Sequence, residues 1–267
     1  MKIIVFTDVH YFAGDMKTAI FNTKKKLVKY ALPFLDKLTE KINREYHPDL
    51  AVNLGDLIQD TTEQDGDVLA LEFMFDRLKR INARTVSVLG NHDLKMMDSV
   101  EQVESIMGEK STCAFDMNGW HLVFLTTEVR CELGTERGGC YKAQYLARET
   151  IDWLREDLTK NTLPSLIFTH YALAEDDSIE DECMFMKNRG EVKEIIRSHG
   201  NVRGVFYGHQ HRTKTSVEDG IPHYGLGSPI ADRDMTGSPD GVYLEIDLDK
   251  EDYTVTTHFI TKEELSL

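Results

Sequence analysis

The feature that most constrains this chain is a short apolar run that ends at a polar cluster, repeated five times along the sequence. The runs cover residues 2–6, 50–54, 85–89, 165–168 and 204–207. Apolar runs of this length are typical of strands buried on both faces, as in a parallel sheet. Because the carboxyl ends of parallel strands share one edge of a sheet, we expect the polar residues that follow the runs to meet there.

The polar residues after the runs form one chemical set. They comprise carboxylates, imidazoles and a single amide, with no thiolate: Asp8, His10, Asp56, Asn91, His92, His170, His209 and His211. Ligands of this kind suit first-row transition metals such as Mn, Fe or Zn better than Ca or Mg alone. Leaving His92 aside, the seven other side chains exceed what one ion needs. The sequence therefore predicts two metal ions that share a bridging carboxylate.

Such a dinuclear centre indicates a displacement reaction with water as the nucleophile. Two ions about 3.5 to 4 Å apart hold a bridging hydroxide and clamp the attacking and leaving oxygens of an in-line displacement. The leaving alcohol then still needs a proton donor. His92 is the candidate, because its neighbour Asn91 is an uncharged oxygen ligand and the imidazole can face the substrate.

Taken in order, the motifs resemble those of a known family. Asp8-x-His10, Gly55-Asp56, Gly90-Asn91-His92-Asp93, His170 and Gly208-His209-x-His211 are similar to the five motifs of the calcineurin-like metallophosphoesterase superfamily. The resemblance implies an α/β fold, a four-layer α/β/β/α sandwich of two mixed sheets flanked by helices. By motif matching it implies these roles: Asp8, His10 and His211 hold one metal, Asn91, His170 and His209 hold the other, Asp56 bridges them, and His92 acts on the leaving group.

Two departures separate the chain from the protein serine/threonine phosphatase branch. Those enzymes follow the bridging aspartate with Val-Asp-Arg-Gly and end the third motif in Glu. Here residues 57–60 read Leu-Ile-Gln-Asp, and the third motif ends in Asp93. The sequence is more similar to the bacterial cyclic-nucleotide phosphodiesterases and their neighbours, which include ADP-ribose and CDP-alcohol pyrophosphatases. Asp60 and Asp93 are both candidates for the acid that orients His92.

The resemblance implies a phosphohydrolase in which the metal-bridged hydroxide attacks the phosphorus of a small phosphodiester, with a cyclic nucleotide among the candidate substrates. A nucleotide pyrophosphatase and a phosphomonoesterase are the alternatives within the enzyme class. A non-catalytic scaffold on the same fold is the alternative from another class. Loss of motif histidines would favour the scaffold, and every motif histidine is present.

Composition limits the classes of partner that the protein is expected to bind and the compartment in which it is expected. With 31 basic and 46 acidic residues, the formal charge is −15, which disfavours nucleic acid and anionic membranes and leaves a small phosphorylated substrate as the expected partner. No apolar run reaches the length of about 18 residues that a membrane-spanning helix needs, and we expect a cytoplasmic protein. The cysteines lack metal-site spacing and are expected as free thiols: Cys113, Cys131, Cys140 and Cys183. The oligomeric state stays open.

Periodicity predicts one domain over residues 1–267. Helical spacing covers residues 16–45, with a kink or two helices expected at Pro33, and residues 68–81, 145–158 and 191–198. A capping-box pattern over residues 99–102 predicts a short helix that begins at Ser99 and ends at Gly108. Hairpin turns are predicted at Asn118-Gly119 and Asp219-Gly220. Residues 128–141 and 174–188 lack a period, and we expect them to form irregular loops that select the substrate.

Overall fold

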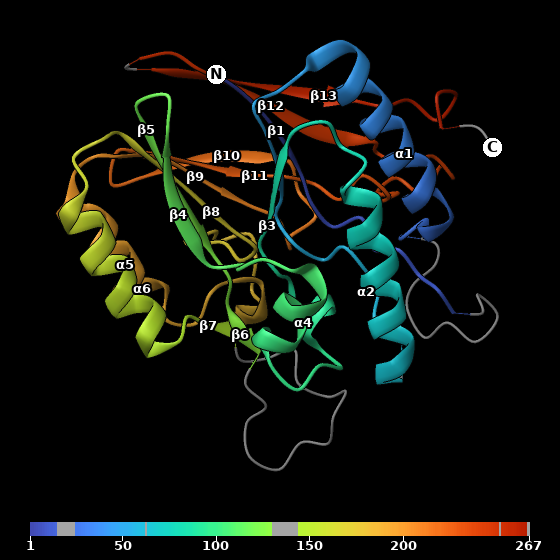
Figure 1. Ribbon diagram of the computed structural model, residues 1–267, viewed down its shortest axis with the longest axis horizontal. Helices are drawn as coiled ribbons and strands as arrows, with labels where there is room; N and C mark the ends of the chain where they lie inside the picture. The colour runs from blue at the N-terminus through green and yellow to red at the C-terminus, as the bar shows by residue number, and fades with distance from the viewer. Residues whose placement is uncertain (15–24, 62, 130–143, 251, 266–267) are drawn as a thin grey trace.

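The computed structural model describes residues 1–14, 25–61, 63–129, 144–250 and 252–265. Two mixed β-sheets pack face to face, and helices cover their outer faces (Figure 1). This is the expected four-layer α/β/β/α sandwich. Within the described ranges, no helix has the length and apolar character needed to cross a lipid bilayer.

The first sheet has the strand order β13-β12-β1-β2-β3. Its parallel half consists of β1 (Lys2–Phe6), β2 (Leu50–Asn53) and β3 (Arg84–Ser87). Antiparallel pairing adds β12 (Val242–Leu248) beside β1, followed by β13 (Tyr253–Phe259). The carboxyl ends of β1, β2 and β3 therefore lie at one edge of this sheet.

The second sheet has the order β10-β11-β9-β8-β5-β4. Its central strands β5 (Trp120–Leu125), β8 (Ser165–Thr169) and β9 (Val202–Tyr207) are parallel, and β4 (Cys113–Met117) joins β5 through an antiparallel hairpin. Strands β10 (Lys214–Glu218) and β11 (Ile221–Gly225) form a second hairpin, in which β11 runs parallel to β9. The five apolar runs are thus divided between two sheets, because three belong to the first sheet and two to the second.

Apolar side chains fill the space between the sheets. Ile3, Val5, Val52 and Leu244 of the first sheet pack with residues such as Leu122 of the second. Aromatic rings cross the inner face of the second sheet as a ladder with centroid separations of 5.5, 4.9, 5.2 and 4.8 Å: Phe115, Phe124, Phe168, Phe206 and Tyr224. A shift of one residue would turn any of these rings to the other face, so the ladder fixes the register of five strands.

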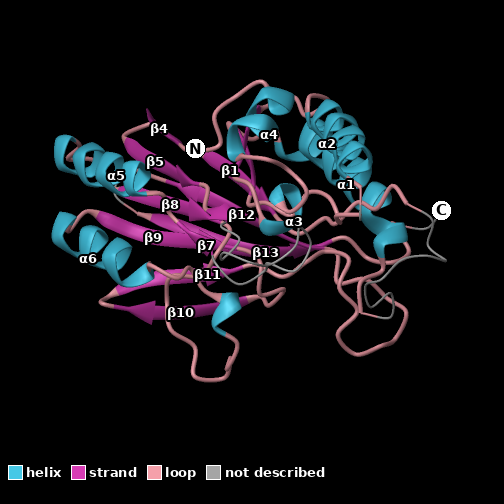
Figure 2. Ribbon diagram, turned by 90° about the horizontal axis from the view of Figure 1, so that it is seen from below, coloured by secondary structure: helices cyan, strands magenta, loops and turns pink. Residues whose placement is uncertain are grey.

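Helices cover the outer faces through their apolar sides. On the first sheet lie α1 (Ala31–Lys41) and α2 (Gln64–Leu78), and on the second lie α5 (Arg148–Lys160) and α6 (Arg189–His199), as Figure 2 shows. The shorter elements are α3 (Asn91–Leu94), α4 (Val100–Met107), η1 (Val28–Tyr30), η2 (Ile42–Tyr46) and η3 (Glu182–Met184). A separate pair of short strands, β6 (Glu128–Val129) and β7 (Gln144–Tyr145), lies near α3.

Three predicted boundaries were wrong. Pro33 does not kink a long helix, because it lies in the first turn of α1, where a backbone N–H has no helical partner. Of the predicted helix over residues 16–45, residues 16–24 lie outside the described part of the chain. Helix α2 begins at Gln64 rather than 68, and α5 begins at Arg148 because the preceding residues 144–145 pair with β6.

Turn and cap predictions were confirmed. Ser99 Oγ accepts a hydrogen bond of 3.3 Å from the Gln102 backbone N–H, and α4 ends at Gly108 with a φ of 82°. Asn118 and Gly119 both have positive φ, 51° and 83°, as a two-residue hairpin turn requires. Cys113 and Cys183 are free thiols. Cys131, Cys140 and most of the predicted loop over residues 128–141 lie outside the described residues.

Candidate metal centre

The predicted ligands lie where the carboxyl edges of the two sheets meet. Loops after β1 and β2 carry Asp8, His10 and Asp56, and α3, which follows β3, carries Asn91 and His92. Loops after β8 and β9 carry His170, His209 and His211. Three groups of these side chains each place their ligand atoms within 4.8 Å of one another: Asp8, His10 and His211; Asp56, His170 and His209; and His10, Asp56 and His92. Residues about 200 positions apart in the chain are therefore neighbours at one site, as predicted.

In the first group, two imidazoles and a carboxylate face a common point. The Nε2 atoms of His10 and His211 are 2.9 Å apart, and His211 Nε2 is 3.0 Å from Asp8 Oδ1. Asp8 Oδ1 is buried and has no hydrogen-bond partner. Its other oxygen, Oδ2, accepts a hydrogen bond of 2.7 Å from Thr7 Oγ1. An unpaired buried carboxylate oxygen is costly, and a metal ion beside the two imidazole nitrogens would satisfy it.

In the second group, backbone carbonyls select which imidazole nitrogen is free. His170 Nδ1 donates to Leu54 O at 2.7 Å, which leaves its buried Nε2 without a hydrogen-bond partner, 3.4 Å from Asp56 Oδ2. His209 Nε2 donates to Cys183 O at 3.1 Å, which leaves Nδ1 for a ligand. Hydrogen bonds of this kind fix the tautomer of metal-binding histidines.

Asp56 lies between the two groups. Its Oδ2 is 3.4 Å from His170 Nε2 and 3.8 Å from His10 Nε2, while Oδ1 accepts a hydrogen bond of 2.8 Å from the His92 backbone N–H. Asn91 is buried, and its side-chain oxygen accepts a hydrogen bond of 2.9 Å from the hydroxyl of Tyr171. The buried unpaired atoms and the nitrogen and oxygen donor set together fit two transition-metal ions.

The backbone at the centre is held in an uncommon conformation. Five candidate ligands have φ between 50° and 62°: Asp8, His10, Asp56, His209 and His211. Non-glycine residues in this left-handed region cost roughly 1 to 3 kcal/mol each and cluster at functional sites. Close packing adds to the constraint, because a Cβ at Gly90 would stand 2.2 Å from Asp56 Oδ1.

Burial and neighbouring charges set the protonation states. Burial favours protonated Asp8 and Asp56, but nearby imidazoles outweigh it and hold the pKa of each carboxyl below its usual value. Burial lowers the pKa of His10 well below its usual value, and burial together with the charge of His170 lowers the pKa of His209 to about 3. Burial also acts to lower the pKa of His170, but the negative charge of Asp56 outweighs it and raises that pKa to about 9. Ionised carboxylates and neutral imidazoles are the forms that bind metals, so His170 would lose a proton on binding one.

Asp60, and not Asp93, orients His92. Asp60 Oδ1 is hydrogen-bonded to His92 Nδ1, and its Oδ2 forms an ion pair of 2.6 Å with Lys95 Nζ. Asp93 points into the loop instead, where it accepts backbone N–H groups from Asp56, Leu57, Ile58 and Gly90 at 2.8 to 3.2 Å. With Nδ1 held by Asp60, His92 Nε2 faces the centre, 3.9 Å from Asp56 Oδ2.

Two further residues reach the centre without belonging to a motif. Lys26 places its Nζ 3.0 Å from Gln59 Oε1, beside His10 and His92. Tyr171 is fully buried, with its ring centroid 4.1 Å from that of His209. Because Tyr171 directly follows the motif residue His170, the sequence indicates that it lies near the centre. Nothing in the sequence around Lys26 distinguishes it from neighbouring lysines.

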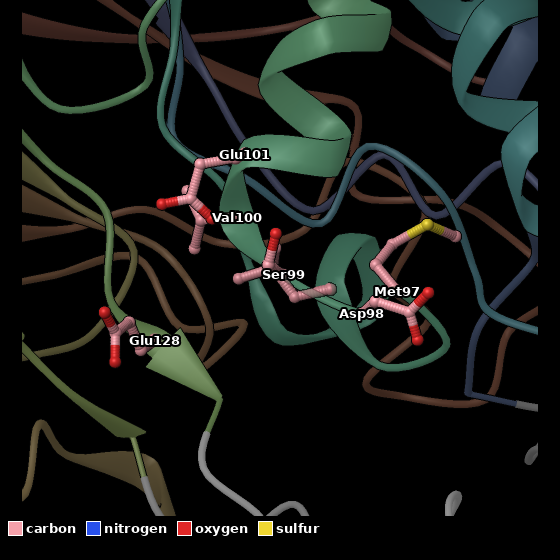
Figure 3. Close-up of a pocket in the computed structure, with 7 residues that line it drawn as sticks. Met97, Asp98, Ser99, Val100, Glu101 and Glu128 are labelled. Atoms are coloured by element: carbon pink, nitrogen blue, oxygen red, sulfur yellow. The ribbon is translucent and has the colours of Figure 1, made fainter.

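A cavity of about 210 Å³ lies beside α3, which carries Asn91 and His92. Figure 3 shows the side chains that line it from α4, β6 and the loop between α3 and α4: Met97, Asp98, Ser99, Val100, Glu101 and Glu128, with Leu94 completing the lining. Three of these side chains are carboxylates, so the cavity repels a phosphate group.

Comparison with known proteins gives the family. The model of the calcineurin-like phosphoesterase family matches residues 1–213, and the chain belongs to this family. It is 25% identical over 230 residues to a 3′,5′-cyclic adenosine monophosphate phosphodiesterase of Haemophilus influenzae, a match that covers 82% of this chain and 73% of that protein. It is 24% identical over 171 residues to a probable cyclic nucleotide phosphodiesterase of Synechococcus, covering 63% of this chain and 60% of that protein's length.

Solved structures share the fold. A dimetal phosphatase from Danio rerio superposes with a TM-score of 0.75 at 17% identity, covering 96% of this chain and 95% of that one. A purple acid phosphatase from yellow lupin seeds superposes with a TM-score of 0.59 at 13% identity, covering 99% of this chain and 54% of that one. At these identities the likeness concerns the fold.

Proposed function

We propose that this chain is a dinuclear metal-dependent phosphodiesterase of small molecules, with a 3′,5′-cyclic nucleotide as the leading candidate substrate. The observation that carries the proposal is the convergence of carboxylate and imidazole ligand atoms at the junction of the two sheets. The names of the Haemophilus and Synechococcus relatives support the choice of substrate class. We also propose that residues 1–267 form one domain and that the protein is cytoplasmic.

Within this proposal, each ligand set draws on both sheets. Asp8, His10 and His211 hold one ion, and His170 and His209 hold the other, with Asp56 between them. Asn91 is assigned to the second ion by its motif. Mn, Fe and Zn are the candidate ions. When bound, two such ions neutralise phosphate charge and activate water at neutral pH.

His92 acts on the leaving group in this scheme. Its Nε2 faces the centre and delivers a proton to the leaving oxygen, while Asp60 accepts the hydrogen bond from Nδ1 and stabilises the positive imidazolium before the transfer. The hydrogen bond between His92 and Asp60 and the distance of 3.9 Å between His92 Nε2 and Asp56 Oδ2 support these two roles.

The first test measures metal content and hydrolysis together. The purified protein, loaded with Mn, is expected to hold two ions per chain and to hydrolyse bis(p-nitrophenyl) phosphate and cyclic AMP, with loss of activity on chelation. Comparison of the products from cyclic AMP, ADP-ribose and a nucleoside monophosphate separates a diesterase from a pyrophosphatase and a monoesterase. Inactivity of the two-metal protein toward all of them would refute the proposal and favour a scaffold.

Two variants test the assigned roles. His92→Ala is expected to keep both metals and to lose rate by roughly 10²- to 10⁴-fold, the usual contribution of a general acid. Asp56→Asn is expected to lose metal as well, because Asp56 lies between both ligand groups. Equal metal loss in the two variants would contradict this division of roles.

A further inference from the structure

Lys26 brings a positive charge to the candidate metal centre from a segment without motif residues. Its Nζ is 3.5 Å from His92 Nε2, 3.5 Å from His10 Nδ1 and 3.0 Å from Gln59 Oε1. In the proposed function, His92 Nε2 is the atom that meets the leaving oxygen. The ammonium group of Lys26 therefore lies on the side of the centre that the phosphate of a substrate reaches.

The backbone holds Lys26 in this place. The Leu27 N–H donates to Ile230 O at 2.9 Å, and the Asp232 N–H donates to Lys25 O at 2.9 Å, so the segment pairs with the chain on both sides of Lys26. At the other end of the side chain, Gln59 is buried and its Nε2 donates to Asp60 Oδ1 at 3.1 Å. The position of the ammonium group is thus fixed at both ends.

The charge of Lys26 is not neutralised by a direct partner. Lys95, the other lysine at the centre, is ion-paired with Asp60 at 2.6 Å. Across the ranges that the structure describes, Lys26 forms no salt bridge, and its hydrogen-bond partners are Gln59 Oε1 at 3.0 Å and the imidazole nitrogens His10 Nδ1 and His92 Nε2, both at 3.5 Å. A lysine ammonium has three donors, and only the contact with the amide is short, so the donors at the two long contacts can turn to an anion.

We propose that Lys26 is a substrate-binding residue that donates a hydrogen bond to a non-bridging oxygen of the phosphoryl group beside His92. This inference rests on the proposed function and adds a residue to it. By holding a non-bridging oxygen, Lys26 fixes the phosphoryl group in the site, which is a positioning contribution to the reaction. Orthophosphate carries the same oxygens and binds at the same place.

The direct test is binding of inorganic phosphate to the Mn-loaded protein, measured by titration calorimetry alongside metal content. Lys26→Met is expected to keep two metals and to bind phosphate about 10- to 100-fold more weakly, the effect of losing one charge-assisted hydrogen bond. Lys26→Arg is expected to keep part of the affinity. Lys25→Met is the matched control, because Lys25 is the exposed neighbour, and it is expected to match the wild type.

A series of aryl methyl phosphates with leaving groups of increasing basicity gives an independent readout. Lys26→Met is expected to lose rate equally across the series, since Lys26 contacts a non-bridging oxygen, whereas the loss in His92→Ala grows with leaving-group basicity. Lys26→Gln serves as a second neutral variant in case Lys26→Met does not fold.

Unchanged phosphate affinity in a neutral Lys26 variant that keeps both metals would overturn the inference. Loss of metal from such a variant, or a loss of rate that grows with leaving-group basicity, would overturn it as well. These outcomes concern Lys26 alone. A wild-type protein with two metals that neither binds phosphate nor hydrolyses an ester would instead overturn the proposed function.

Discussion

Replacing Asp60 by asparagine tests how His92 is held. Asparagine keeps the shape of the side chain and an oxygen that can accept a hydrogen bond from His92 Nδ1, but it removes the negative charge to which the proposed function assigns a role in proton transfer. Asp60 is only 3% exposed, so water screens this interaction little. The variant therefore isolates the electrostatic part of the contact.

The magnitude follows from the kind of hydrogen bond that is exchanged. A hydrogen bond to a charged group contributes about 1.5 to 3 kcal/mol, against about 0.5 to 1.5 kcal/mol for a neutral one. The difference of about 1 to 2 kcal/mol lowers kcat roughly 5- to 30-fold. Asp60→Asn also removes the ion pair between Asp60 and Lys95, and the double variant Asp60→Asn with Lys95→Met separates the effect of that ion pair on stability from the loss of rate.

The assay is kcat for diesters with good and poor leaving groups, with metal content measured on the same samples. Loss of rate is expected to be small for p-nitrophenolate, which leaves as a stable anion, and largest for an alkoxide. The double variant also lacks the ion pair, and it is expected to show the same loss of rate as Asp60→Asn. If Asp60→Asn were fully active on poor leaving groups, or if Asp93→Asn alone showed the leaving-group dependence, the assignment of Asp60 would be wrong.

Two further predictions concern stability and metal affinity. Tyr171→Phe removes the hydroxyl that donates to Asn91 and is expected to weaken the binding of one of the two ions about 10- to 100-fold, measured by metal titration; unchanged affinity for both ions would rule out a role for this contact. Asp67 is buried, and burial raises its pKa to about 6. The contribution of the protonated Asp67 carboxyl to the stability of the fold is therefore fully present below about pH 4 and is lost as the pH rises through about 6. Between pH 5 and pH 8, the free energy of unfolding of Asp67→Asn is therefore expected to rise by about 1 to 2 kcal/mol relative to that of the wild type. Denaturant unfolding measures this difference, and a difference that does not change with pH would contradict the expectation.

The strand ends and their ligands could be predicted because the signals are local. An apolar run such as residues 165–168 predicts a buried strand, and the polar residue that follows, His170, lies at its carboxyl end. Capping at Ser99 and the turn at Asn118-Gly119 are local for the same reason. Which strands pair with one another depends on residues far apart in the chain, so the division of the five runs between two sheets could not be predicted from the runs themselves.

The choice between Asp60 and Asp93 also required tertiary structure. Both are near His92 in sequence or motif, and only the path of the loop after β2 brings Asp60 to its Nδ1. Lys26 was missed because its place depends on pairing with residues about 200 positions away. Pro33 was misinterpreted because its effect on a helix depends on where the helix begins, and apolar spacing does not mark that residue.

The division of the ligands between two sheets has a mechanical consequence. Asp8 and His10 extend from β1, and His211 extends from the end of β9 on the opposite sheet. Asp56 extends from β2, and it meets His170 and His209 from β8 and β9. In the proposed function, ions bound in these groups would cross-link the two halves of the sandwich at one rim, and each ion that binds the folded chain alone would stabilise it by RT ln(1 + [L]/Kd). Chelation is then expected to loosen this rim first, with hydrogen exchange rising at the carboxyl ends of β1, β2, β8 and β9, while the aromatic ladder keeps the centre of the second sheet closed.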